Sequence, residues 1–461
     1  MNNKEYISPF TSRYASEDML FIFSPQFKYS SFRKLWVALM KAQKTLGLDI
    51  SQKGIEEAEK NIDNIDFAKV AKVEEKLRHD VMAHIHVYTE QCPSAKIHLG
   101  ATSAFVTDNT DLIQMKKALQ LALKKLSLII KELALFAENH ANTTCLGFTH
   151  LQPAQPTTVG KRACLWLQDF AIDFQSLNRL EENLPFLGSK GATGGQTSFV
   201  SLFNSKEKVK KLEQLIAKNF EFKKVLIISG QTYPRKIDVD IVNALASFAA
   251  SAHKMATDLR LLANFGEIKE HFGKEQVGSS AMPHKQNPII AERICSLSRF
   301  LISLAQNPLY TLATQWLERS LDDSANRRLS LSESFLSLDA ILNLIYGLLK
   351  GLHVDEKMIR KNLKEKAQYI ALENILMLVV KKGKDRQKAH EILRKYSKEK
   401  KIFELLKKDK FLNLSSKDIE EVQKFPTSVI AEQVTEFLNS EIFPLYKDFK
   451  KASVKIPEVS I

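Results

Sequence analysis

The sequence predicts an all-α protein, because glycine and proline are too sparse for a chain built from many strands and turns. There are 16 glycines and 13 prolines among 461 residues. None of them falls inside three long stretches, Gly100–Gly147, Pro234–Gly266 and Pro308–Gly347. Strands and turns need more frequent interruptions than helices do, so these three gaps indicate long helices.

The first gap also shows the helical period. Apolar residues recur there every three or four positions, at Leu112, Met115, Leu119, Ala122, Leu126, Ile129, Ile130 and Leu133. A helix of about 35 residues spans roughly 50 Å, which is long for an isolated domain. We therefore expect such helices to share a bundle between subunits, with a monomeric bundle as the alternative.

Three regions follow from this pattern. Residues 1–101 form a mostly helical N-terminal domain with a His/Asp-rich segment, and residues 102–354 form a central domain with the longest helices. Residues 355–461 form a shorter, Lys-rich helical domain.

Composition narrows the class of protein. A hydrophobic content of 44% provides for a large core. The most apolar stretch, 126–137, is interrupted by Lys131 and Glu132, so no membrane helix is expected, and the opening MNNKEYISPF lacks the apolar region of a signal peptide. No CxxC pair occurs among Cys92, Cys145, Cys164 and Cys295, which predicts neither a zinc site nor disulfides and favours the reducing cytoplasm.

A net charge of +14 raises the alternative of a nucleic-acid binder. Residues 351–461 hold 24 Lys/Arg against 17 Asp/Glu, which is half of the excess. These lysines alternate with acids along helical stretches such as 357–366, as on a solvated face, and no nucleic-acid-binding motif accompanies them. No nucleic-acid or membrane partner is expected.

The segment 266–288, GEIKEHFGKEQVGSSAMPHKQNP, is too rich in small and polar residues to continue either neighbouring helix. Loops of about 20 residues are usually functional or disordered. Val277, Met282 and Pro283 could serve as apolar anchors, which favours function.

The core of this loop, GSSAMPHKQNP at 278–288, resembles the GSSxMPxKxNP signature of the fumarase/aspartase superfamily at every fixed position. The resemblance implies that Ser279 is the general base. It also implies that Lys285 and Asn287 hold a substrate carboxylate. Removing a proton beside a carboxylate makes a dianion, so charge stabilisation in a site closed against water must dominate the catalysis.

A second segment, GFTHLQPAQPTTVGKR at 147–162, places His150 before a Pro/Gln-rich turn, and Thr157 or Thr158 can cap the next helix. A histidine beside a turn is more often structural than catalytic. The THxQPAQ context, however, resembles that of the superfamily's general acid, which implies that His150 protonates the leaving nitrogen.

The segment RHDVMAHIH at 78–86 gathers Arg78, His79 and Asp80. A metal site using Asp80 and His84 is the alternative, although HExxH is absent and Arg78 would repel a cation. The segment resembles its counterpart in the adenylosuccinate lyase family, which implies substrate contacts for Arg78, His79 and Asp80.

Two further segments carry the resemblance. In HLGATSAFVTDNTD at 98–111, Thr102 and Ser103 could equally cap a helix or bind a carboxylate, and the family implies contact with the succinyl group.

In ERSLDDSANRRLS at 318–330, Ser324 and Arg328 share a helical face with Arg319 upstream. Taken alone, Asp323 and Arg327 read as a surface i,i+4 pair. The likeness to WxERxLDDSANRR implies that Arg319, Ser324 and Arg328 hold the nucleotide phosphate and nearby groups.

Smaller matches, SRYASEDM at 12–19 and SGQTYPRK at 229–236, nominate Arg13, Tyr14 and Gln231, and Arg293 also matches. The resemblance runs from about Ser8 to about Lys350 and is to the eukaryotic-like branch of the family.

The resemblance implies a three-domain homotetramer whose long central helices form one bundle and whose active sites draw on several subunits. It implies elimination of fumarate from adenylosuccinate, giving AMP, and from SAICAR, giving AICAR, without cofactor or metal. Argininosuccinate lyase, fumarase or aspartase chemistry and a catalytically inactive structural homologue are the alternatives.

Overall fold

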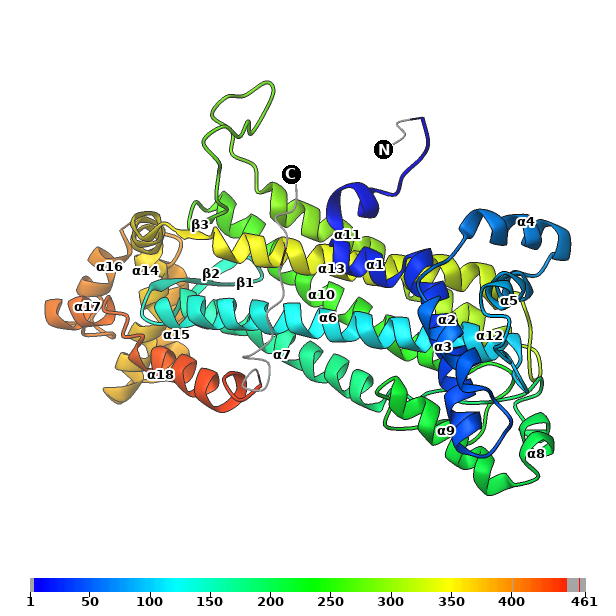
Figure 1. The fold of residues 1–461 in the computed structure, drawn as a ribbon. Helices are drawn as coiled ribbons and strands as arrows, with labels where there is room; N and C mark the ends of the chain where they lie inside the picture. Colours follow the sequence, from blue (N-terminus) through cyan, green and yellow to red (C-terminus); the bar gives the residue numbers. More distant parts are fainter. Residues whose placement is uncertain (1–3, 400, 446–455, 457–461) are drawn as a thin grey trace.

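The computed structural model describes residues 4–399, 401–445 and 456. Five long helices lie side by side along the molecule and form its core (Figure 1). They are α6 (Ser103–Asn139), α7 (Val159–Asn183), α10 (Lys236–Asn264), α11 (Ile289–Leu304) and α13 (Asp323–Lys350). The all-α prediction is confirmed, and α6 and α10 fill the first two Gly/Pro-free gaps.

The N-terminal helices contact the bundle at two places: the first two, which end before residue 23, lie along α13, and the other four pack at one end of the bundle (Figure 1). They are η1 (Phe10–Tyr14), α1 (Glu17–Ile22), α2 (Pro25–Thr45), α3 (Gln52–Lys60), α4 (Phe67–Leu77) and α5 (Asp80–Gln91). Two further helices, α8 (Thr197–Phe203) and α9 (Lys206–Asn219), lie near the same end.

The C-terminal helices lie mainly beyond the other end of the bundle, except that α18 packs against α7 (Figure 1). They are α14 (Glu356–Lys381), α15 (Arg386–Tyr396), α16 (Ile402–Lys408), α17 (Ser416–Val422), α18 (Ser428–Phe437) and η2 (Leu438–Ile442).

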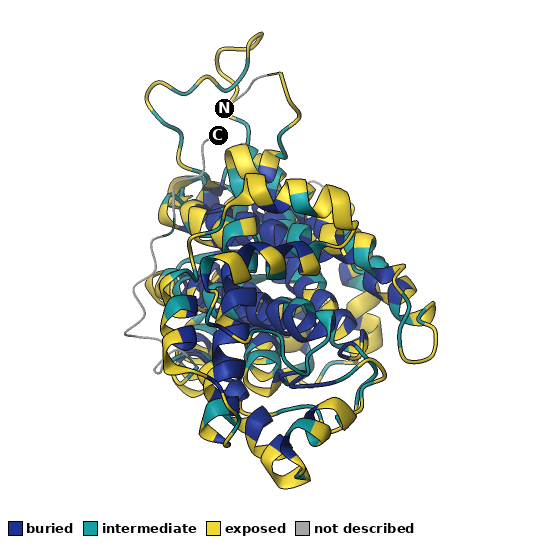
Figure 2. Ribbon diagram, turned by 45° about the vertical axis from the view of Figure 1, so that its right-hand side comes forward, coloured by how far each residue is buried: buried dark blue, intermediate teal, exposed yellow. Residues whose placement is uncertain are grey.

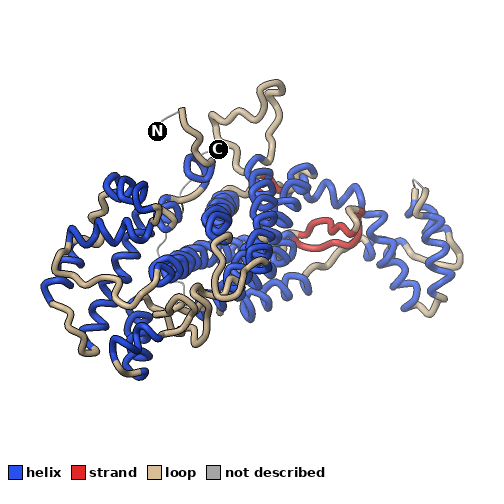
Figure 3. The backbone as a smooth tube through the Cα atoms, turned by 90° about the vertical axis from the view of Figure 1, so that its right-hand side faces the viewer, coloured by secondary structure: helices blue, strands red, loops and turns tan. Residues whose placement is uncertain are grey.

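Two short two-stranded antiparallel sheets, of which the first is a hairpin, interrupt the helices within the described residues (Figure 3). The strands β1 (Thr144–Thr149) and β2 (Gln152–Thr158) pair across a two-residue turn, with a bulge at Gly147. The strands β3 (Ile268–Lys269) and β4 (His353–Val354) join the base of the 266–288 loop to the chain before α14. The sequence pattern missed both strand pairs, because β2 contains two prolines and β3 has only two residues.

Three apolar clusters stabilise the described part of the chain, of which the smallest joins Val70, Ala83 and Val87 between α4 and α5. The largest one joins side chains from Phe10 to Ile442 and includes nearly all of the buried face of the five long helices (Figure 2). The third one is confined to residues 371–422. The domain boundaries at residues 101 and 354 stay predictions.

The third Gly/Pro-free gap does not hold one helix, and the prediction there was wrong. The helix α12 (Gln306–Ala313) ends nine residues before α13 begins. The chain turns at Leu317, which has φ 43°, and the carbonyl of Glu318 accepts a hydrogen bond from the Gln231 N–H at 3.0 Å. This tertiary contact, which the local sequence cannot reveal, stabilises the interruption between α12 and α13.

By length and composition α13 alone among the described helices could cross a membrane. Inside the protein, however, 78% of its apolar window is buried, as expected for a core helix of a bundle.

Candidate active site

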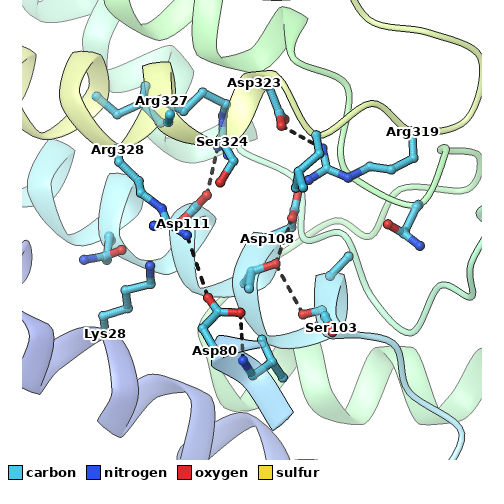
Figure 4. A pocket seen from close by; sticks show the side chains of 18 of the residues that line it. Lys28, Asp80, Ser103, Asp108, Asp111, Arg319, Asp323, Ser324, Arg327 and Arg328 are labelled. Atoms are coloured by element: carbon cyan, nitrogen blue, oxygen red, sulfur yellow. Dashed lines mark hydrogen bonds and ion pairs between the residues drawn. The ribbon is translucent and has the colours of Figure 1, made fainter. Parts of the chain in front are cut away.

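A cavity of about 1230 Å³ opens at the end of the bundle where α4, α5, α6 and α13 meet (Figure 4). Nine of the predicted site residues line it: Arg78, His79, Asp80, Thr102, Ser103, Gln231, Arg319, Ser324 and Arg328. They come from four separate segments of the chain, and the fold brings them together.

The α4–α5 junction supplies one wall of this pocket. Arg78 ends α4 in the left-handed conformation with φ 53°. His79 then caps α5, because its Nδ1 accepts a hydrogen bond from the Met82 N–H at 3.3 Å. The carboxylate of Asp80 faces the guanidinium of Arg328 at 3.8 Å across the pocket (Figure 4).

The start of α6 supplies a hydroxyl that is free to bind a ligand. Thr102 occupies the N-cap position, but its side chain makes no capping hydrogen bond. Its Oγ1 is buried and has no partner among the described residues. The N-terminus of a long helix favours a negatively charged ligand, so this hydroxyl and that of Ser103 are suited to a carboxylate.

The floor of the pocket is a buried set of ion pairs. Asp323 accepts hydrogen bonds from Arg235 at 2.7 Å and from Arg319 at 2.8 Å, and Arg235 also binds Asp108 at 2.8 Å. Burial alone would raise the pKa of Asp323, but the charges of Arg235 and Arg319 outweigh it and hold that pKa below its usual value. The Arg319 guanidinium is therefore fixed by an ionised carboxylate.

Reading Asp323 and Arg327 as a surface pair was wrong. Asp323 is 1% exposed and Arg327 is 8% exposed. Arg327 binds Asp238 at 2.7 Å and Asp111 at 2.9 Å instead of Asp323. Ser324 and Arg328 do share α13, whereas Arg319 lies in the preceding loop (Figure 4).

The two predicted proton-transfer residues do not line this pocket. His150 lies in the turn of the β1–β2 hairpin, where it and Leu151 have φ 53° and 56°. Thr158 caps α7 as expected, since its Oγ1 accepts from the Lys161 N–H at 3.0 Å. Ser279 lies in the loop that protrudes from the bundle in Figure 1. In one chain the predicted base and the predicted acid are thus on separate appendages.

The 266–288 loop is stabilised at its base. Glu270 accepts hydrogen bonds from the N–H groups of Ile290 and Ala291 at 3.0 and 2.7 Å. The Asn287 amide donates to the Gly278 carbonyl at 3.0 Å, and the Lys285 side chain is exposed. The apolar anchors expected at Val277 and Met282 are 79% and 44% exposed, so they do not anchor the loop within this chain.

Arg13, Tyr14 and Arg293 form a third group outside the pocket. The Arg293 guanidinium lies 5.8 Å from the centre of the Tyr14 ring. The Nη1 of Arg293 is buried and has no hydrogen-bond partner among the described residues. A phosphate or another anion would satisfy this group.

Motif reading missed several residues of the pocket. Asp108, Asp111 and Arg235 lie inside segments that had been singled out, but their ion-pair partners are far away in the sequence. Lys28 also lines the pocket (Figure 4). No motif marks it, because it lies on the regular helix α2.

Metal binding by Asp80 and His84 has little geometric support. The His84 ring stacks on Tyr29 with centroids 3.8 Å apart, and burial lowers its pKa to about 4. Among the described residues there is no group of three or more His, Cys, Asp or Glu side chains placed to hold a metal ion.

Comparison with known proteins agrees with this geometry. A family model described as "Lyase" matches residues 26–300. The adenylosuccinate lyase of Schistosoma mansoni is 43% identical, with 97% of each chain covered, and that of Saccharomyces cerevisiae is 42% identical, covering 97% of this chain and 96% of the relative. The chain belongs to the adenylosuccinate lyase family.

Solved structures show the same fold at lower identity. The 3-carboxy-cis,cis-muconate lactonizing enzyme of Pseudomonas putida has a TM-score of 0.84 at 21% identity, covering 95% of this chain and 99% of its own. A fumarate lyase from Mesorhizobium sp. BNC1 has a TM-score of 0.81 at 22% identity, covering 95% of this chain and all of its own. Eukaryotic adenylosuccinate lyases are more similar in sequence than an archaeal one, from Archaeoglobus fulgidus, at 31% identity, which confirms the predicted branch.

Proposed function

We propose that this protein is a carbon–nitrogen lyase that eliminates fumarate from adenylosuccinate, giving AMP, and from SAICAR, giving AICAR. One observation carries the proposal: a single chain of this family gathers Arg319, Arg328, Thr102 and Ser103 in one pocket. Guanidinium groups suit a phosphate, and the hydroxyls at the start of α6 suit a carboxylate.

The chemistry needs a base and an acid on either side of the carbon–nitrogen bond. Ser279 takes the proton from the succinyl carbon, the resulting carbanion expels the nitrogen, and His150 supplies a proton to that nitrogen. These steps balance protons and electrons with side chains alone, so no cofactor enters the reaction.

The local geometry at Ser279 supports its role as the base. Its Oγ accepts hydrogen bonds from the N–H groups of Ala281 at 3.3 Å and Met282 at 3.1 Å. Hydrogen bonds to the charged form of a group favour that form, so these donors stabilise an alkoxide. Lys285 in the same loop adds positive charge.

The complete site, in this proposal, is assembled from several copies of the chain in a homotetramer. Its support is the separation of the pocket, the His150 hairpin and the Ser279 loop within one chain. Mixing Ser279→Ala protein with His150→Ala protein under subunit exchange should restore activity that neither variant has alone. Absence of any restored activity in mixed tetramers would contradict the shared site.

The activity itself is tested by incubating purified protein with adenylosuccinate and with SAICAR and following the ultraviolet spectrum. We expect conversion of both. Turnover of argininosuccinate or malate without conversion of adenylosuccinate would reject the proposal.

We also propose that the protein works in the cytoplasm, on the support of four free, buried cysteines. Fractionation of cells with an antibody to the protein tests this location, and recovery in an organelle or membrane fraction would contradict it.

A further inference from the structure

A charged pair lies inside the bundle, away from the pocket. The Lys125 ammonium on α6 pairs with the Asp339 carboxylate on α13, and both side chains are 0% exposed. Lys125 Nζ also donates to Asn343 Oδ1 at 2.8 Å and to Ser16 Oγ at 3.0 Å. All three donors of the ammonium are therefore used.

This buried group is bonded to the chain directly after η1. Asp339 Oδ2 accepts from the Ser16 N–H at 2.6 Å, and Asn343 Nδ2 donates to the Tyr14 carbonyl at 3.3 Å. More than 320 residues separate the two ends of each of these bonds. We call Ser16, Lys125, Asp339 and Asn343 the buried anchor.

Stability alone gives little reason for such an anchor. A buried ion pair loses its hydration, and well-packed apolar residues in its place are often as stable or more so. Apolar contacts such as that of Phe10 with Phe300, with ring centres 5.7 Å apart, already attach η1 to the bundle. Unlike apolar contacts, directed hydrogen bonds fix the backbone at one position and one rotation.

We propose that Lys125, Asp339 and Asn343 are positioning residues that fix the backbone of Arg13 and Tyr14 so that these two residues can contact the nucleotide. The inference rests on the proposed function, because it takes the substrate to be a nucleotide. The anchor holds the Tyr14 carbonyl and the Ser16 amide, and thereby places the Tyr14 ring beside the Arg293 guanidinium. None of the three positioning residues touches substrate in this proposal.

The test variant is K125M/D339L, which removes both charges together and leaves neither buried alone. Its matched control is K116M/E181L, which removes another buried pair of α6, at 2.8 Å, on the side that faces α7. The measurements are KM and kcat for adenylosuccinate, inhibition constants for AMP and for fumarate, and the rate of tryptic cleavage after Arg13.

We expect K125M/D339L to raise KM and the AMP inhibition constant about tenfold, a loss of binding that leaves kcat within about twofold. The fumarate inhibition constant should not change, because Arg13 and Tyr14 serve the nucleotide end. Cleavage after Arg13 should become faster. The control variant should match wild type in all five measurements.

A folded K125M/D339L protein with wild-type KM, AMP inhibition and cleavage rate would overturn the inference. If that variant does not fold, Asn343→Leu removes the bond to the Tyr14 carbonyl together with the bonds of Asn343 to Lys125 and Asp339, and it should show the same pattern. Wild-type protein that does not convert adenylosuccinate would overturn the proposed function instead. The cleavage assay needs no substrate and would still show whether the anchor holds this segment.

Discussion

The pocket and the two appendages that carry Ser279 and His150 are built in opposite ways. In the pocket, Arg235, Asp323 and Arg319 are joined by hydrogen bonds of 2.7–2.8 Å, and Asp323 is 1% exposed. Ser279 and His150 lie on an exposed loop and an exposed hairpin turn. In the proposed function, this pocket fixes one end of the nucleotide within one chain, whereas Ser279 and His150, like Arg13 and Tyr14, lie outside it and need a second copy of the chain to reach the same substrate.

The largest expected effect comes from the appendages. Ser279→Ala and His150→Ala should each lower turnover by about 100-fold or more, because each removes a proton-transfer group. Both variants should remain folded tetramers, since neither side chain belongs to the core. Steady-state kinetics, circular dichroism and size-exclusion chromatography check this, and wild-type rates from either variant would contradict the assigned roles.

A change in the conformation of the 266–288 loop should lower activity nearly as much as the loss of Ser279 or His150. A Cβ at Gly278 would lie 1.9 Å from the backbone oxygen of Lys285, so Gly278→Ala must move the loop. Displacing a catalytic group by about 1 Å can cost roughly 100-fold in rate. Gly273→Ala in the same loop is the control, because its nearest contact would be 3.6 Å.

The Gly278 experiment is read from kcat/KM and the melting temperature of each variant. We expect the melting temperature of both variants to stay at the wild-type value, since the loop is exposed. Equal activity of Gly278→Ala and Gly273→Ala would show that the close approach of Gly278 to the Lys285 backbone oxygen has no importance for catalysis.

Within the pocket the expected effect is on binding. Arg319→Met removes a charged donor aimed at the ligand, and hydrogen bonds to charged groups are worth about 1.5–3 kcal/mol. KM should therefore rise roughly ten- to hundredfold while the change in kcat stays smaller. Arg360→Met removes an exposed arginine that pairs with Glu356 on α14 and should leave both parameters unchanged. A fall in kcat with an unchanged KM would show instead that Arg319 acts in the catalytic step.

Local sequence was enough to predict the helices but not their interruptions. The spacing of apolar residues gave α6, because a long amphipathic helix repeats one physical pattern many times. The break before α13 depends on a bond between Gln231 and Glu318, and β2 depends on pairing with β1. Such contacts form between distant segments, so the residue pattern of neither segment alone shows them.

The residues of the site were predictable because short motifs mark them, whereas their partners were not. Ser279 and Arg319 lie in recognisable segments, but Arg235 and Asp108 are 127 residues apart, and Lys125 and Asp339 are 214 apart. Only the packed bundle shows that these charges meet. Likewise, the expected apolar anchors of the 266–288 loop, Val277 and Met282, are 79% and 44% exposed, which their apolar character alone does not predict.

The smallest effect on turnover is expected at Asp173, a buried carboxylate that no arginine pairs with among the described residues. Comparing Asp173 with Asp323 tests whether the arginines set the charge of the pocket floor. Asp173 on α7 is 4% exposed, and the Ser247 hydroxyl donates to it at 3.1 Å. Burial raises its pKa to about 6. The folded state therefore holds the Asp173 proton more tightly than the unfolded state does. This contribution to stability is fully present below the usual pKa of 3.8 and is lost as the pH rises through about 6.

Asp173→Asn cannot ionise, so it should be about as stable as wild type at pH 4. At pH 8 it should be more stable by about 3 kcal/mol, because the pKa shift of about two units is worth that much.

For Asp323→Asn, the change in stability with pH should have the opposite sign. Its arginines hold the pKa of Asp323 low, so its contribution is present above the usual value and lost as the pH falls through the lowered one. Thermal melts of both variants and wild type from pH 2 to pH 8 check this, because the contribution of Asp323 changes only below its usual pKa of 3.8. Parallel pH profiles for the two variants would show that the arginines do not set the charge of the pocket floor.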